Sequence, residues 1–292
     1  MIRIYSKAYM NDLFSFAVAL VLATLAIVQP LTAQKLKPEE IVAKHLESIG
    51  SNEARTAVRS QITVGDAVVK FISRKNGIIE GRIVMASSGE KNFVGLNLNA
   101  LDYPGERFSF DGTKAKVANT VNGQKSVLAS FVSSNDLILR ESLLGGVLSS
   151  SWALSNLSVR KAKLSPSGMR TFDGRNYYVL NYSPKGGGDI DISLYFDKET
   201  FRHTRTEYTR TASAAIGRTI DESARQSETR LKVIEDFSDF KVFSGLTLPQ
   251  SYKLLYTTIG QNGTTEVEWA YRLNEFAFNQ TMDEKAFDAE AK

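Results

Sequence analysis

The stretch from residue 189 to residue 196 reads Asp-Ile-Asp-Ile-Ser-Leu-Tyr-Phe, with a large apolar side chain at every second position from Ile190. Successive side chains of a β-strand point to opposite faces, so this stretch predicts a strand with one apolar face and one solvated face. Parallel strands that are covered by helices on both sides read as continuous apolar runs instead. The alternation therefore favours antiparallel pairing.

The same alternation recurs at residues 266–273, where Val267, Trp269, Tyr271 and Leu273 oppose Glu266, Glu268 and Arg272. Strand-like runs of this kind begin at Thr56 and are separated by turn residues. Four dipeptides accept positive φ at both central positions of a type I′ hairpin turn: Asp111-Gly112, Asn122-Gly123, Asp173-Gly174 and Asn262-Gly263. The chain from Thr56 onward therefore predicts an antiparallel meander.

Three segments depart from the β pattern. Pro38 and Gly50 are typical of the start and end of a helix, and Val42, Leu46 and Ile49 between them share one face. Residues 135–157 combine helical spacing with a Gly145-Gly146 break, which predicts two short helices or one bent helix. Residues 202–230 are rich in Arg, Thr, Ser and Glu, and they predict two strand ends joined by a long mobile loop.

The first 33 residues are typical of a signal peptide. Arg3 and Lys7 precede an uncharged apolar run that ends at Val28, and Ala33 supplies the small residue before the cut. The run is shorter than the ~20 residues that span a bilayer, so cleavage after Ala33 is favoured over a retained membrane anchor. Residues 34–292 show no linker or composition shift, and we expect them to form a single domain in the periplasm.

The composition argues against several classes of function. The formal net charge of +4 is spread among acids rather than gathered in a stripe, so we expect no nucleic acid to bind, although transient contact with a membrane surface is compatible with it. The chain has no cysteine and only His45 and His203 as histidines, far apart in sequence. Without a recognisable catalytic motif, we predict no enzyme, no catalytic residue, no metal site and no cofactor.

The aromatic content points to a covered apolar surface. The chain holds 16 Phe, 11 Tyr and 2 Trp, and a one-layer sheet with a wide apolar face needs a cover. If the Leu-rich segment is that cover, its glycine break leaves it able to shift, and a space beneath it would suit an acyl chain. Alternatively, these side chains pack together as a closed core. The residues predicted to line the cavity and its lid are Leu137, Leu143, Leu144, Val147, Leu148, Trp152, Phe108, Phe110, Ile192, Leu194, Phe196, Trp269 and Tyr271.

The order of elements over residues 36–290 resembles the outer-membrane lipoprotein-sorting carrier family, the LolA/LolB-like proteins. The similarity rests on the opening helix, the mid-chain helices and several short motifs: Asp111-Gly112, Tyr195-Phe196-Asp197, Phe237-Ser238-Asp239-Phe240, Gly245-Leu246-Thr247-Leu248-Pro249, Leu273-Asn274-Glu275-Phe276 and Phe287. The resemblance implies an α+β fold, mainly antiparallel β, in which a strongly curved, unclosed β-barrel is covered by a few helices. It also implies an apolar cavity that receives lipid acyl chains.

Two functions follow as hypotheses. The first is a periplasmic, non-enzymatic carrier or binding protein whose partners are lipid or lipoprotein acyl chains. The second is a scaffold with a filled core that docks envelope proteins or senses envelope stress.

Overall fold

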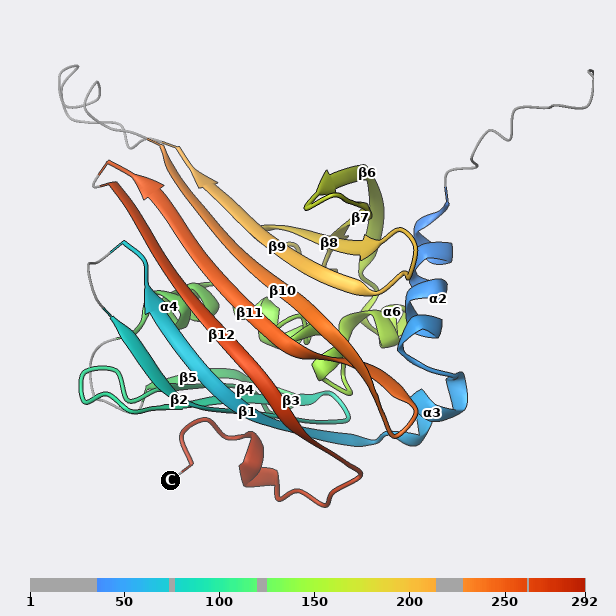
Figure 1. Cartoon of the computed structure of the whole chain (residues 1–292), viewed down its shortest axis with the longest axis horizontal. Helices are drawn as coiled ribbons and strands as arrows, with labels where there is room; N and C mark the ends of the chain where they lie inside the picture. Colours follow the sequence, from blue (N-terminus) through green and yellow to red (C-terminus); the bar gives the residue numbers. More distant parts are fainter. Residues whose placement is uncertain (1–35, 74–76, 120–124, 214–227, 262, 292) are drawn as a thin grey trace, which may run out of the picture. The chain divides into compact units, whose positions relative to one another are not determined.

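Twelve antiparallel strands form a single sheet in the order β5-β4-β3-β2-β1-β12-β11-β10-β9-β8-β7-β6 (Figure 1). The computed structural model describes residues 36–73, 77–119, 125–213, 228–261 and 263–291, and residues 37–292 make up one compact unit. The strands are β1 Ser60–Phe71, β2 Ile78–Ser88, β3 Lys91–Leu98, β4 Glu106–Phe110, β5 Ala115–Asn119, β6 Lys163–Phe172, β7 Arg175–Ser183, β8 Asp191–Asp197, β9 His203–Ala212, β10 Thr229–Phe243, β11 Leu246–Gly260 and β12 Gly263–Phe278.

The sheet stays open, because β5 and β6 are its two edges and do not pair with each other in the described part of the chain. Its strands bend around the helical segments between β5 and β6 (Figure 1). The predicted fold class is confirmed: a mainly antiparallel, curved and unclosed sheet with a few covering helices. Helical segments are α2 Pro38–Ile49, α3 Asn52–Ala57, α4 Val127–Ser134, α5 Leu137–Arg140, η1 Gly146–Leu148, η2 Ala153–Asn156, α6 Leu157–Arg160 and η3 Glu284–Phe287.

The inner face of the sheet carries the apolar positions of each strand. Tyr271 of β12 pairs with Tyr252 of β11, which in turn pairs with Phe237 of β10. The ring centroids of Phe237 and Tyr252 are 5.1 Å apart in a stacked arrangement, and all three side chains are buried. Such cross-strand aromatic pairs fix the register, because a slip by one residue would turn every apolar side chain toward solvent.

The outer face carries charged side chains of alternating sign. Arg205 of β9 contacts Asp236 of β10 at 2.6 Å, Lys253 of β11 lies 4.0 Å from Asp236, and Glu268 of β12 lies 3.8 Å from Lys253. Partly exposed pairs of this kind stabilise a protein by only about 0–1 kcal/mol each. They identify this face as the solvated one, and therefore the opposite face as the side where an apolar site must lie.

The predicted first helix is present as α2, with Pro38 at its start and Gly50 after its end. The Asp173-Gly174 turn connects β6 with β7 and has positive φ at both residues, as predicted. Asp111-Gly112 lies between β4 and β5, but the connection is a four-residue loop in which Gly112 has a positive φ and Asp111 does not, so the type I′ prediction was wrong there. The turn predicted at Asn122-Gly123 lies outside the described residues, as do Asn262 and residues 214–227 of the predicted loop. That loop is flanked by β9 and β10, the two strand ends predicted for residues 202–230.

Two helices were missed by the sequence analysis. The prediction that strands begin at Thr56 was wrong, because α3 extends to Ala57 and β1 begins at Ser60; the Ser51 side chain accepts a hydrogen bond from the Ala54 N–H and caps α3. Helix α4 precedes the predicted helical segment and is capped by Ser126 in the same way. Among the described residues, none of the helices combines the length and the apolar composition needed to cross a bilayer.

Candidate ligand-binding site

Residues 126–160, named here the covering segment, pack against the inner face of the sheet. The glycine break predicted from the sequence divides the segment into short helical pieces, since Gly145 and Gly146 have φ values of +80° and +50°. Those angles are in the left-handed region that favours glycine. Leu143 and Trp152, on either side of the break, are 0% and 1% exposed. The covering segment therefore closes over the apolar face in this structure.

Twelve of the thirteen residues predicted to line a cavity are buried, and Leu137 is half-buried. Trp152 of the covering segment and Phe196 of β8 both contact the His203 ring, at centroid distances of 5.0 and 5.6 Å. The ring centroids of Tyr271 and Tyr252 are 5.1 Å apart. Trp269 lies farther along β12, where its indole N–H donates to the Tyr103 hydroxyl at 3.1 Å. Side chains from the covering segment and the sheet thus meet around the two histidines.

His45 of α2 and His203 of β9 lie in the core, 1% and 0% exposed, with ring centroids 6.0 Å apart. The indole N–H of Trp152 donates to His45 Nε2 at 3.1 Å, and His45 Nδ1 lies 3.1 Å from the carbonyl oxygen of Phe201. A carbonyl only accepts and an indole N–H only donates, so the proton of His45 is on Nδ1. His45 consequently ties α2 to the covering segment and to the turn that precedes β9.

Burial lowers the pKa of His45 from 6.5 to about 4, and the hydrogen bond to Phe201 offsets part of that effect. The unfolded chain binds this proton near pH 6.5, whereas the folded chain binds it only near pH 4. The contribution of His45 to stability is therefore fully present above pH 6.5 and is lost as the pH falls toward 4. We expect the difference in unfolding free energy between the wild type and His45→Gln to fall by about 3 kcal/mol over this range. Urea unfolding at several pH values measures it, and a difference that does not change with pH would contradict the assignment.

Polar side chains on the inner face hold the backbone of the covering segment. Gln61 of β1 donates to the carbonyl of Leu148 at 3.0 Å, and Asn92 of β3 donates to the carbonyl of Leu139 at 2.8 Å. The Ser87 hydroxyl of β2 accepts from the Ser150 N–H at 2.8 Å. These contacts satisfy backbone groups that the irregular segment would otherwise bury unpaired. The cover is therefore docked by specific hydrogen bonds as well as by apolar packing.

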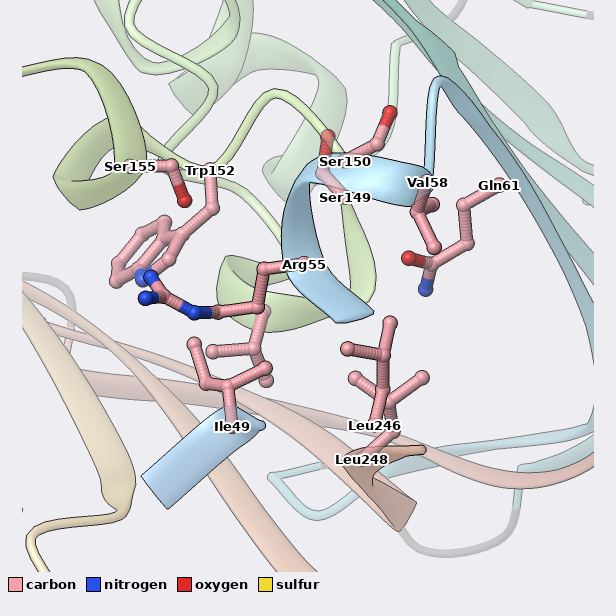
Figure 2. A pocket seen from close by; sticks show the side chains of 11 residues that line it. Ile49, Arg55, Val58, Gln61, Ser149, Ser150, Trp152, Ser155, Leu246 and Leu248 are labelled. Atoms are coloured by element: carbon pink, nitrogen blue, oxygen red, sulfur yellow. The ribbon is translucent and has the colours of Figure 1, made fainter. Parts of the chain in front are cut away.

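The cavity that contacts Val147 and Trp152 has a volume of about 50 Å³. Ile49 and Arg55 of the α2–α3 region, Ser149 of the covering segment and Leu248 of β11 also line it (Figure 2). We call it the α3 cavity. Its volume holds a few water molecules and is too small for an acyl chain. Side chains therefore fill most of the space beneath this part of the cover in the closed structure.

A larger pocket of about 440 Å³ lies between α4 and the neighbouring ends of β1 and β12. We call it the α4 pocket. Its apolar lining includes Phe71 of β1, Val127 of α4 and Val267 and Trp269 of β12, and Tyr103 contributes to the same wall. Asp102 and Lys125 provide charged groups. Since Trp269 also belongs to the inner face of the sheet, the pocket adjoins the covered apolar surface.

The described residues include no group of three or more His, Asp or Glu side chains positioned to hold a metal ion. Two buried carboxyl groups are the unexpected polar feature of the interior. Glu106 of β4 accepts hydrogen bonds from Tyr103 and Ser126, and Glu235 of β10 accepts from Tyr208, Tyr252 and the Gly145 N–H. Burial raises the pKa of each to about 7.

Several solved structures are similar to this chain. A LolA superfamily protein from Nitrosomonas europaea matches with a TM-score of 0.46 and 11% identity, covering 86% of this chain and 97% of that one. A putative outer membrane lipoprotein-sorting protein domain from Vibrio parahaemolyticus matches with a TM-score of 0.45 and 15% identity over 85% and 97%. A DUF1329 family protein from Desulfovibrio piger matches with a TM-score of 0.40 and 11% identity over 86% and 96%.

The chain is thus similar to LolA superfamily structures, as the sequence resemblance predicted. No protein-family model matches the sequence, and neither does any curated protein. The likeness concerns the fold and says nothing of what this chain binds.

The sequence analysis missed the polar part of this site. His203 lies in a strand whose neighbours are Arg, Thr and Glu, and nothing in that pattern distinguishes it from a solvated side chain. Glu235 does occupy the inward parity of β10 with Val233 and Phe237, and this alternation is a signal that places a carboxylate in the core. Asn92 and Gln61 also occupy inward positions of β3 and β1, but the backbone groups that they contact depend on where the covering segment passes.

Proposed function

We propose that this chain is a non-enzymatic binding protein or carrier that takes up an acyl chain between the covering segment and the inner face of the sheet. The α4 pocket is the observation that carries the proposal. Its volume of about 440 Å³ falls within the roughly 300–1,000 Å³ typical of small-molecule sites. It offers an entrance beside the covered apolar surface, because Trp269 belongs to both.

The covering segment has the construction of a movable cover. It consists of short helical pieces with the glycine turn at 145–146 between them, and in the described part of the chain no regular ladder of hydrogen bonds joins it to the sheet. An acyl chain entering the α4 pocket would extend beneath the cover by displacing apolar side chains such as Leu143 and Leu148. The entering methylene groups replace the contacts that those side chains lose, at roughly 0.8 kcal/mol per buried methylene.

Exposed apolar side chains near the α4 pocket support entry at this end. Leu101, which is 98% exposed, precedes the pocket residue Asp102, and Ile72, which is 52% exposed, follows the pocket residue Phe71. Exposed apolar groups beside a pocket are typical of a surface that receives an apolar partner.

Export to the periplasm completes the proposal. The N-terminal 33 residues have the charge, apolar run and small-residue site of a cleavable signal peptide. N-terminal sequencing of the exported protein should begin at Gln34. Recovery of an intact Met1 on membrane-bound protein would contradict cleavage.

Substitution of Val127 in the α4 pocket tests the proposed function. Val127 is half-buried at the first position of α4, so Val127→Asp places a charge in the path of an acyl chain while remaining compatible with a helix start. We expect the dissociation constant of a dansyl-labelled fatty acid to rise by about tenfold or more, the equivalent of about 1.4 kcal/mol. Energy transfer from the two tryptophans, Trp152 and Trp269, to the dansyl group measures binding in protein that has been stripped of lipid by denaturing extraction and refolded.

Ser130→Asp is the matched control, because Ser130 is exposed on the same helix. We expect it to bind like the wild type. Absence of fatty-acid binding by the wild type, together with absence of lipid in the mass spectrum of the extract, would overturn the proposal.

The filled space around the α3 cavity favours a second candidate, a scaffold with a solid core that docks envelope proteins. Its volume of about 50 Å³ leaves no room for a ligand while the cover is closed. The two candidates differ in whether the cover moves. A protein that takes up no fatty acid at any concentration, yet captures an envelope protein through its outer surface, would support the scaffold.

A further inference from the structure

Glu106 and Glu235 are 0% exposed, and among the described residues every hydrogen bond that they accept comes from an uncharged donor. A buried carboxylate without a cationic partner is strongly disfavoured unless it is fully hydrogen-bonded or protonated. Both carboxyl groups lie at contacts between the sheet and the covering segment. Their position, rather than their burial alone, suggests a role in holding that segment.

Glu235 joins β10 to the glycine turn of the cover. Its Oε1 accepts from the Tyr208 hydroxyl at 2.8 Å, and its Oε2 accepts from the Tyr252 hydroxyl at 3.1 Å and from the Gly145 N–H at 2.8 Å. The turn packs closely against β2, since a Cβ on Gly145 would lie 2.2 Å from the terminal methyl group of Met85. Two of the donors belong to the sheet and the third belongs to the covering segment.

Glu106 joins β4 to the start of α4. Its Oε2 accepts from the Ser126 hydroxyl at 2.6 Å, and its Oε1 accepts from the Tyr103 hydroxyl at 2.7 Å. The same Ser126 oxygen accepts from the Ala129 N–H at 2.9 Å and thereby caps α4. Tyr103 in turn accepts from Trp269 in the wall of the α4 pocket. Glu106 therefore connects the proposed entrance with the first turn of the cover.

Opening of the cover would change the environment of both groups together. In the closed structure burial raises each pKa from 4.5 to about 7, and the hydrogen bonds offset only part of that rise. The hydrogen bonds from Tyr208, the Gly145 N–H and Tyr252 lower the pKa of Glu235, and the charged neighbour Asp236 raises it further; the hydrogen bonds from Ser126 and Tyr103 lower the pKa of Glu106. Tyr271 lies within the electrostatic range of both carboxyl groups.

Water that enters when the cover lifts would return each pKa toward 4.5. The closed form thus binds protons more tightly than the open form, and linkage requires that protons favour closure. We propose that Glu106 and Glu235 keep the covering segment closed while they are protonated, and that their ionisation loosens it to admit the ligand. That a ligand enters through this opening rests on the proposed function, but the motion of the covering segment can be measured without a ligand.

The absence of cysteine from the chain makes a thiol reporter selective. Ser87 is 1% exposed on β2 beneath Ser150, so Ser87→Cys reacts with a small neutral maleimide only when the cover opens. Ser130→Cys on the exposed face of α4 gives the reaction rate of a free thiol at each pH. The ratio of the two rates reports the opening equilibrium. We expect this ratio to increase by about tenfold for each carboxyl group between about pH 6 and about pH 8.

Carboxyl-to-amide variants assign the effect. Glu106→Gln and Glu235→Gln mimic the protonated side chains, so the double variant carrying the reporter should react slowly at both pH values. Glu90→Gln, at an exposed position, should keep the wild-type increase. A ratio that does not change with pH in the unsubstituted reporter, or that rises equally in the double amide variant, would overturn the inference. The unsubstituted reporter remains decisive even if an amide variant fails to fold.

Binding of dansyl-labelled fatty acid to the same samples separates this inference from the proposed function. A pH-dependent ratio of reaction rates without fatty-acid binding would contradict the proposed function and still support the role of Glu106 and Glu235 in holding the covering segment closed. Equal fatty-acid affinity at both pH values, together with a constant ratio of reaction rates, would support the proposed function and contradict the role of the two carboxyl groups.

Discussion

Replacing Gly146 with alanine is expected to lower the free energy of unfolding by about 2–4 kcal/mol. Gly146 has a φ of +50°, which an L-residue adopts only with strain. A Cβ at this position would also lie 3.2 Å from both His203 Nδ1 and Phe237 Cζ, which belong to the buried aromatic cluster. The substitution therefore combines backbone strain with overpacking against two buried rings, which would have to shift by a few tenths of an ångström. Urea denaturation measures the loss.

Gly187→Ala is the matched control for the backbone contribution. Gly187 has a φ of +71°, but no atom lies within 4 Å of the position that its Cβ would occupy. We expect a loss of about 1 kcal/mol there. Equal losses at the two positions would contradict the tight packing of the glycine turn against His203 and Phe237.

The sheet could be predicted from the sequence because its strands have two distinct faces. Alternation at residues 189–196 and 266–273 identified β8 and β12 and the face that each buries, and the Asp-Gly turns at 111–112 and 173–174 located two hairpins. Helix α3 and helix α4 escaped prediction, because they are short and begin with serine caps rather than with a long apolar stripe. Local capping is hard to recognise where the helical period covers only one or two turns.

The burial of the apolar side chains was predictable, but the α4 pocket was not, because Trp269 is the only one of the thirteen predicted residues that lines it. Residues such as Leu143 and Phe196 are large and periodic, and the structure buries them as their spacing indicates. The carboxyl of Glu235 and the amide of Asn92 act through contacts with Gly145 and Leu139, residues 90 and 47 positions away in the chain. Contacts over such separations depend on the path of the covering segment, and that path has no period in the sequence.

A disulfide between the cover and the sheet is expected to abolish uptake of an acyl chain beneath the cover. The hydroxyl oxygens of Ser87 on β2 and Ser150 in the covering segment are 2.9 Å apart, and a disulfide joins sulfur atoms about 2.05 Å apart, so Ser87→Cys combined with Ser150→Cys needs only a small adjustment. No other cysteine competes for either thiol. The disulfide joins residues that are 63 positions apart in the chain. The reduced chain entropy of the unfolded state predicts about 4 kcal/mol of added stability when the disulfide has formed.

Fatty-acid binding by this double variant, before and after reduction of the disulfide, tests most directly the claim that the covering segment must move to admit a ligand. The oxidised form should bind dansyl-labelled fatty acid at least about tenfold more weakly than the reduced form, because the competent conformation is no longer populated. The reduced double variant is the reference for the oxidised one, because it carries the same two substitutions, and Ser150→Cys alone keeps the hydrogen bond from its N–H to Ser87 and should bind like the wild type. Equal binding by the oxidised and reduced forms would show that the acyl chain occupies a site that exists while the cover is closed.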